Sequence, residues 1–148
     1  MNRFLFAVFF LSTCTCNLWA QAATKTFHIA YDCREASAID LTGLEGQVEL
    51  RARGGSRILI EMNISMENGS MILLRNLLKE EHFAVEMAME STTAKIKRKI
   101  FGKPKSYFAT GPQDPIPGLP IIERVSYVVY VPPKQLPTVI ISEAQKVH

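Results

Sequence analysis

Apolar and polar residues alternate along much of this chain, which is typical of strands with one buried face. Gly54 and Gly55 can adopt the positive φ angles that a tight turn needs, and the alternating stretch "VELRA" precedes them. The longest alternation follows the glycines and places five apolar side chains on one face: Ile58, Ile60, Met62, Ile64 and Met66. This pattern predicts a mainly β protein.

Shorter alternations predict further strands in "TKTFHIAYDC", "SAIDL", "FAVEMAMES", "AKIKRK", "IIERVSYVVYV" and "TVIIS". The period changes in "NGSMILLRNLLKEEHF", where Ser70 can cap a helix. Apolar residues there are spaced for one helical face: Met71, Leu74, Leu77 and Leu78. We therefore expect one short helix over residues 71–80. Five prolines and three glycines predict a loop over residues 102–120, because proline cannot donate to a sheet ladder.

The first 22 residues have the three-part layout of a secretory signal peptide. Arg3 is followed by an apolar run, residues 4–11, and small residues end the segment at Ala20-Gln21-Ala22. The apolar run is too short to span a bilayer. We expect residues 1–22 to be removed, which leaves residues 23–148 as a single β-rich domain exported to the periplasm or cell surface of a bacterium.

The cysteines and the charge balance agree with this picture. Thr13 is bulkier than lipoprotein signals usually allow before the modified cysteine, so lipidation of Cys14 is disfavoured. Cys33 remains after cleavage, and we expect it to be buried rather than to form an intermolecular disulfide. The mature chain has sixteen basic and fourteen acidic side chains, a net charge of +2, which does not suggest a nucleic-acid partner.

Residues for catalysis or metal binding are not arranged in a known pattern. His28, His82 and His148 have no second ligand at zinc-site spacing, and no G-x-S-x-G or phosphate-binding glycine motif occurs. The neighbouring carboxylates Asp32 and Glu35, and Glu80 and Glu81, are typical of solvated turns and helix ends. We expect no enzymatic activity, no cofactor and no metal.

Basic residues concentrate in "AKIKRKIFGKPK", where Lys95, Lys97 and Lys99 should share one strand face with Arg98 opposite. This stripe could contact an acidic polymer or lipid phosphate. The interpretation that we favour is a solvated or edge strand, on which lysines prevent edge-to-edge aggregation.

The run "LEGQVELRA", a glycine turn, "RILIEMNIS", a leucine-rich segment and "VSYVVYVPPKQLPTVIIS" resembles the bacterial adhesin-like "head GIN" putative autotransporter adhesin domains and related domains of unknown function. The resemblance spans roughly residues 36–142 and includes Val131-Pro132. It implies a small β-roll or β-solenoid without catalytic residues. Family members continue into further coils, so we expect here either a small capped, layered β-domain or a unit that pairs with another chain.

The strand before Val131-Pro132 is apolar on both faces, which predicts cover on both. We expect the helix to give some of this cover, and the other face to need another sheet layer, the proline-rich loop or a partner chain. Our hypothesis is that Val128 and Tyr130 contact a second copy or a larger envelope protein. The leading function is therefore structural or protein-interaction in the envelope. The alternative is a periplasmic binder of a small apolar ligand through methionines of the inner face: Met62, Met66, Met87 and Met89.

Overall fold

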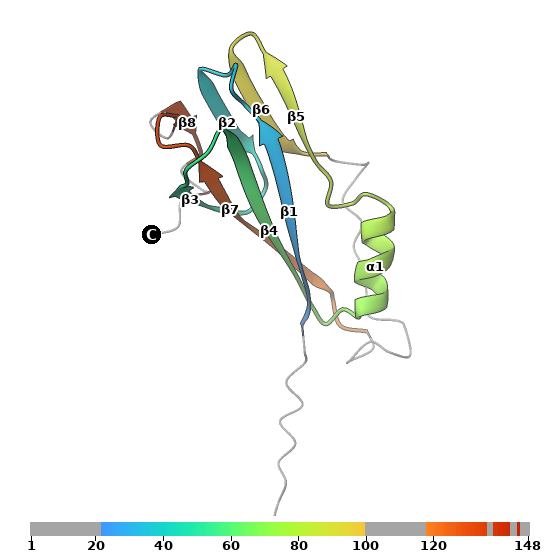
Figure 1. The fold of residues 1–148 in the computed structure, drawn as a ribbon. Coiled ribbons are helices and arrows are strands. Elements are labelled where there is room, and N and C mark those ends of the chain that lie inside the picture. Colours follow the sequence, from blue (N-terminus) through green and yellow to red (C-terminus); the bar gives the residue numbers. More distant parts are fainter. Residues whose placement is uncertain (1–21, 100–117, 136–137, 143–144, 146–148) are drawn as a thin grey trace, which may run out of the picture.

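The computed structural model describes residues 22–99, 118–135, 138–142 and 145, which form two four-stranded β-sheets and one helix (Figure 1). Within these residues the expected mainly β class with one short helix is confirmed. The expected cleavage segment and most of the expected loop over residues 102–120 lie outside the described residues. The signal peptide and the loop therefore stay predictions.

The first sheet contains the longest strands and has the order β1-β4-β7-β3. β4 pairs antiparallel with β1 and with β7, whereas β3 pairs parallel with β7. The bounds are Ala23–Asp32 for β1, Gln47–Ala52 for β3, Arg57–Glu67 for β4 and Ile122–Val131 for β7. β4 thus pairs on one side with β1, from the start of the described chain, and on the other with β7, from near its end.

The second sheet has the order β5-β6-β2-β8. β5 and β6 form an antiparallel hairpin, and β2 pairs parallel with β6 and with β8. The bounds are Ala38–Gly43 for β2, Val85–Glu90 for β5, Thr93–Arg98 for β6 and Val139–Ile140 for β8. Of the architectures expected from sequence, the layered one describes this arrangement, and stacked solenoid coils are not shown by the described residues.

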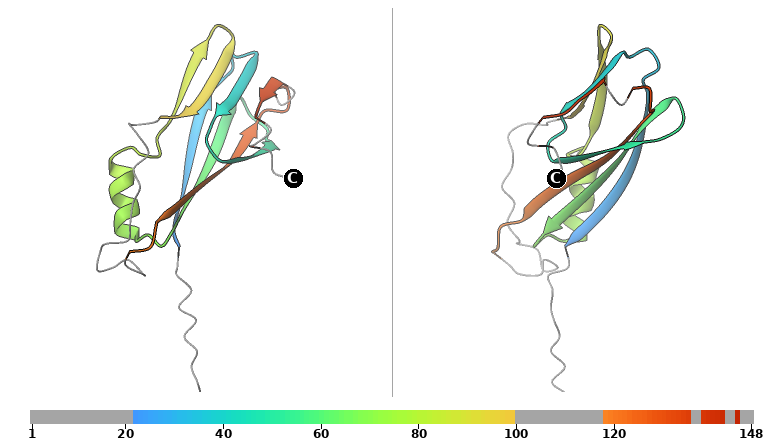
Figure 2. Two further views of the ribbon diagram at one scale, coloured as in Figure 1. Left: turned by 180° about the vertical axis from the view of Figure 1, so that it is seen from behind. Right: turned by 90° about the vertical axis from the view of Figure 1, so that its left-hand side faces the viewer.

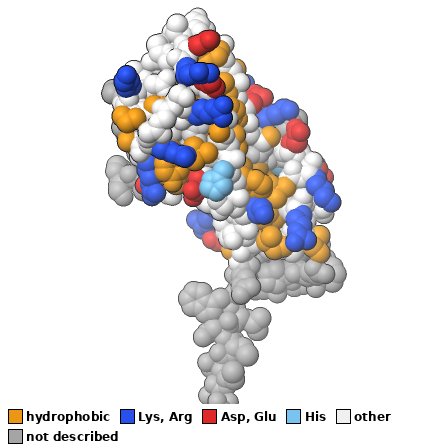
Figure 3. Space-filling view, in the orientation of Figure 1, with side chains coloured by type: hydrophobic (Ala, Val, Ile, Leu, Met, Phe, Trp, Pro, Cys, Tyr) orange, Lys and Arg blue, Asp and Glu red, His pale blue; other side chains and the backbone are white. Residues whose placement is uncertain are grey.

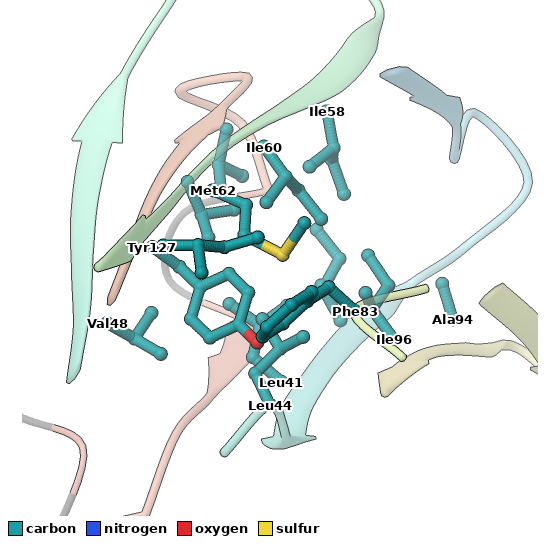
Figure 4. Close-up of a cluster of buried hydrophobic side chains, with 14 of the residues drawn as sticks. Leu41, Leu44, Val48, Ile58, Ile60, Met62, Phe83, Ala94, Ile96 and Tyr127 are labelled. Carbon is teal, nitrogen blue, oxygen red and sulfur yellow. The ribbon is translucent and has the colours of Figure 1, made fainter. Parts of the chain in front are cut away.

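The core lies between the two sheets. Burial alternates along β4, and all five apolar side chains expected to share its inner face are at most 3% exposed. They meet side chains of the second sheet, such as Leu41, Ala94 and Ile96, as well as Val48 and Tyr127 of the first (Figure 4). Burial of these apolar surfaces is the main force that holds the layers together.

The helix α1, Met71–Lys79, covers part of the same inner face (Figures 1 and 2). The backbone N–H of Leu73 donates to the Ser70 hydroxyl, as expected for an N-cap. Leu74 and Leu77 are buried in the core cluster, whereas Met71 is 42% exposed, contrary to its expected place on the buried face. The helix and the second sheet therefore lie on one side of the first sheet.

The connection at Gly54-Gly55 does not join paired strands. Gly55 has a φ of 120°, as a glycine turn permits, but β7 lies between β3 and β4 in the sheet. A tighter requirement exists at Gly46, just before β3. Its φ is 132°, and an added Cβ would overlap the carbonyl oxygen of Val125. Glycine at this position lets β3 begin directly beside β7.

Candidate functional site

The side chains of the first sheet that point away from the core form what we call the outer face. Val128 and Tyr130 lie there on β7, as the alternation predicted, and both are half-buried. Leu59 is the cross-strand partner of Tyr130 and of Ala30. Together with Val128, these side chains form an apolar centre. The side chains of the outer face are all exposed or half-buried. They include Thr24, Thr26, His28, Ala30, Glu49, Arg51, Leu59, Glu61, Asn63, Ser65, Ser126, Val128 and Tyr130. None of the described helices or sheets covers this centre.

Charged and polar side chains surround the apolar centre. Arg51 forms a 2.8 Å ion pair with Glu49, and Tyr130 also interacts with its guanidinium. Glu61 is the cross-strand partner of both His28 and Val128. An apolar centre with tyrosine and arginine, enclosed by a polar rim, is the usual anatomy of a protein–protein contact.

Of the three lysines singled out from the sequence, Lys95 and Lys97 project from β6 on the face opposite its buried residues, and Lys99 follows directly after the strand. Of the two settings expected for this stretch, an edge strand is wrong, because β6 pairs with β5 on one side and β2 on the other. The other, a solvated face, describes the lysines, whose side chains are 41–54% exposed. Each lysine nitrogen lies near a carboxylate: Lys95 at 2.6 Å from Glu90, Lys97 at 3.3 Å from Glu86 and Lys99 at 3.4 Å from Glu81. These carboxylates balance the basic stripe, which weakens its attraction for a polyanion.

A second feature is an apolar groove between the edge strands β1 and β5. It encloses about 490 Å³ and is bounded by Phe27, His28, Ile29, Met62, Leu78, Glu81, Phe83, Ala84, Val85, Glu86 and Lys99. In Figure 3, hydrophobic side chains gather along the middle of this face of the molecule, between the second sheet and the helix. This volume lies within the range of about 300–1,000 Å³ typical of small-molecule sites.

The four methionines proposed to form an apolar pocket do not converge. Met62 is the one that borders the apolar groove, and it points toward Phe83 (Figure 4). Met66 is fully buried, Met89 is 43% exposed, and the Met87 sulfur accepts a hydrogen bond from the Cys33 thiol at 3.5 Å. The alternation predicted one inner face for these methionines. They do not meet, because Met62 and Met66 lie on β4 of the first sheet and Met87 and Met89 on β5 of the second.

A cluster of charged groups joins the two sheets and was not expected from sequence. The Glu123 carboxylate of β7 accepts from Arg98 Nη2 at 2.7 Å and lies 2.9 Å from His82 Nε2. Arg98 also donates to the His82 carbonyl and lies 5.1 Å above the Phe83 ring. It borders a larger, more polar hollow of about 1,070 Å³. His82 and Glu123 are 41 residues apart, so no local pattern indicates this contact.

Two buried groups have strongly raised pKa values. Burial raises the pKa of the Cys33 thiol to about 11, and Cys33 is only 1% exposed, as expected for a buried hydrophobe. Burial also raises the pKa of Tyr127 to about 12. The Tyr127 hydroxyl has no hydrogen-bond partner among the described residues.

The neighbouring carboxylates have structural partners. The Arg34 guanidinium binds Asp32 at 2.7 Å, and these hydrogen bonds lower the pKa of the Asp32 carboxyl. Glu80 is the C-cap residue of α1, and Glu81 pairs with Lys99. Within the described residues there is no group of three or more metal-binding His, Cys, Asp or Glu side chains. What the geometry offers is surfaces for binding.

Comparison with known proteins returns no match to a family model, a curated protein or a solved structure. The resemblance to the "head GIN" adhesin-like domains therefore stays a prediction. In the part of the chain that the structure describes, no helix is long and apolar enough to cross a membrane.

Proposed function

We propose that this chain is a non-enzymatic, exported protein of the bacterial envelope that acts by contact with another protein through its outer face. The observation that carries the proposal is the position of Val128 and Tyr130. They lie on the side of the first sheet that neither α1 nor the second sheet covers. An apolar centre on such a face is a common feature of interaction surfaces.

The partner that we propose is a second copy of the chain. The outer face carries both signs of charge beside its apolar centre: Arg51 and Glu49 lie together on β3 and pair with each other, and Glu61 lies on β4 next to Val128. In a two-fold symmetric contact each copy presents the same patch, so such a mixed rim can be complementary to itself. A larger envelope protein is the competing partner.

Photocrosslinking tests the proposal and identifies the partner. Benzoylphenylalanine replaces Tyr130 in the full chain, and a matched control carries it at Met89, which is exposed on the distant β5 edge. An adduct of twice the chain mass, formed only from position 130, supports self-association. An adduct of another mass would show that the partner is a different envelope protein and not a second copy. Equal or absent adducts at both positions overturn the proposal.

The proposed export has its own test. N-terminal sequencing of the protein from the envelope fraction should begin at Ala23, the first residue of β1. An intact Met1 in the cytosol, or an acylated Cys14, contradicts export by a cleaved signal peptide.

A second candidate function is the binding of a small apolar ligand in the periplasm. It is favoured by the apolar groove between β1 and β5, whose volume and lining suit a small molecule. Val128 and Tyr130 do not border the apolar groove, which meets the outer face at His28, so a ligand in the groove leaves the proposed protein contact free.

A further inference from the structure

The apolar groove is walled by different elements of the fold. Phe27 and Ile29 of β1 form one wall, and Ala84 and Val85, at the start of β5, form the other. Met62 contributes from β4, and Leu78 closes the end beside the helix. Phe27, Ile29, Leu78 and Val85 are half-buried, so their remaining exposed surface is available to a ligand.

Next to the apolar groove, beyond Ile29 and Val85, two contacts link the β1 side to β5. The Tyr31 hydroxyl of β1 donates to the Val85 carbonyl of β5 at 2.7 Å. Nearby, the Cys33 thiol contacts Met87. An extended peptide that paired with the β5 edge would compete with Tyr31 for the Val85 carbonyl. This arrangement disfavours strand addition and favours a compact occupant.

Both carboxylates that border the apolar groove are paired with a lysine. Glu81 lies 3.4 Å from Lys99, and Glu86 lies 3.3 Å from Lys97. A charged ligand would have to compete with these ion pairs, whereas an uncharged ligand would leave them intact. The lining thus offers no unpaired carboxylate to a cation, and its mostly apolar walls favour an uncharged ligand.

We infer that the apolar groove binds a small, uncharged hydrophobic molecule, held by contact with Phe27, Leu78 and Val85. The inference deepens the second candidate function and rests on it. It identifies the class of ligand as neutral and hydrocarbon-rich, in contrast to a fatty acid anion, an organic cation or a peptide strand.

The probe is N-phenyl-1-naphthylamine, an uncharged dye whose fluorescence rises in apolar surroundings, titrated against the mature protein. Ala84→Phe places a ring within the apolar groove, and Ala88→Phe is the matched control on the exposed face of β5. We expect saturable binding to one site, weakened about tenfold or more by Ala84→Phe and unchanged by Ala88→Phe. 1-Decanol should displace the dye, and decanoate at pH 8 should be much weaker.

A second pair of variants keeps the test decisive if Ala84→Phe does not fold. Leu78→Gln makes one wall polar, and Leu73→Gln is its control on the same helix, also half-buried but outside the apolar groove. Loss of binding with Leu78→Gln alone supports the site. Absence of saturable binding, equal loss in both members of a pair, or equal displacement by decanoate overturns the inference. The crosslinks from position 130 are independent of all these outcomes, so failure here leaves the proposed protein contact standing.

Discussion

The hydroxyl of Tyr127 allows a quantitative test of the core. Tyr127 is 1% exposed, and its hydroxyl is unpaired among the described residues. Replacing it with phenylalanine removes a buried polar group and keeps the ring that packs in the core (Figure 4). At pH 7 the hydroxyl is neutral in both states, and removing an unsatisfied group of this kind should be neutral or stabilising by up to about 1–3 kcal/mol.

The difference should grow at alkaline pH. Burial raises the pKa of Tyr127 from 10.0 to about 12 in the folded state. Between these values the unfolded state loses the proton first, so the free energy of unfolding of the wild type falls as pH rises. The loss from this group approaches about 3 kcal/mol above pH 12 and is about 1 kcal/mol at pH 11. Below pH 10 this contribution to the pH dependence is absent.

Urea unfolding at pH 8 and pH 11 measures the effect. The advantage of Tyr127→Phe over the wild type should increase by about 1 kcal/mol between these two pH values. Tyr130→Phe, which removes a phenol from the outer face, serves as the control for general alkaline effects. Parallel pH profiles for wild type and Tyr127→Phe, or a Tyr127→Phe variant less stable at pH 8, would refute the assignment of an unpaired buried hydroxyl.

Two further predictions concern buried groups. Cys33 should react with a thiol reagent at pH 8 far more slowly in the native protein than in urea, because it is buried and its pKa is raised to about 11; equal rates would contradict its burial. Gln145→Ala should lower the free energy of unfolding by about 1–3 kcal/mol, since Gln145 donates to the carbonyls of Leu41 and Leu44; an unchanged urea midpoint would contradict that role.

Local patterns predicted the elements and their buried faces. The alternation in β4 identified the inward side chains, because successive residues of a strand point to opposite faces. The change of period and Ser70 located α1 to within one residue of its observed end. The same parity placed Val128 and Tyr130 on the side of β7 opposite Tyr127.

Strand partners could not be predicted in this way. Periodicity reports which side of a strand is buried but not which strand lies beside it. The pattern thus gave no sign that β7 separates β3 from β4, or that β6 lies inside its sheet. Gln145 shows the same limit, because the C-terminal segment carries no periodic signal, yet its amide satisfies carbonyls about a hundred residues earlier.

The expected cover of β7 was partly wrong for a related reason. The helix was expected to give some of the cover of one face, and another sheet layer, the proline-rich loop or a partner chain to cover the other face. In the structure the helix and the second sheet share the inner face. Sequence spacing gave the amphipathic face of the helix and no information on where it docks. The candidate contact at Val128 and Tyr130 therefore has a clearer structural basis than the alternation provided.

Sedimentation velocity of the mature protein, from low micromolar to near-millimolar concentration, tests the central claim most directly. The wild type should associate into a dimer with rising concentration. A variant with Val128→Lys and Tyr130→Lys should remain folded, because both side chains point away from the core, and should stay monomeric. A wild type that is monomeric at every concentration, or a double variant that dimerises equally well, would contradict a self-contact through the outer face.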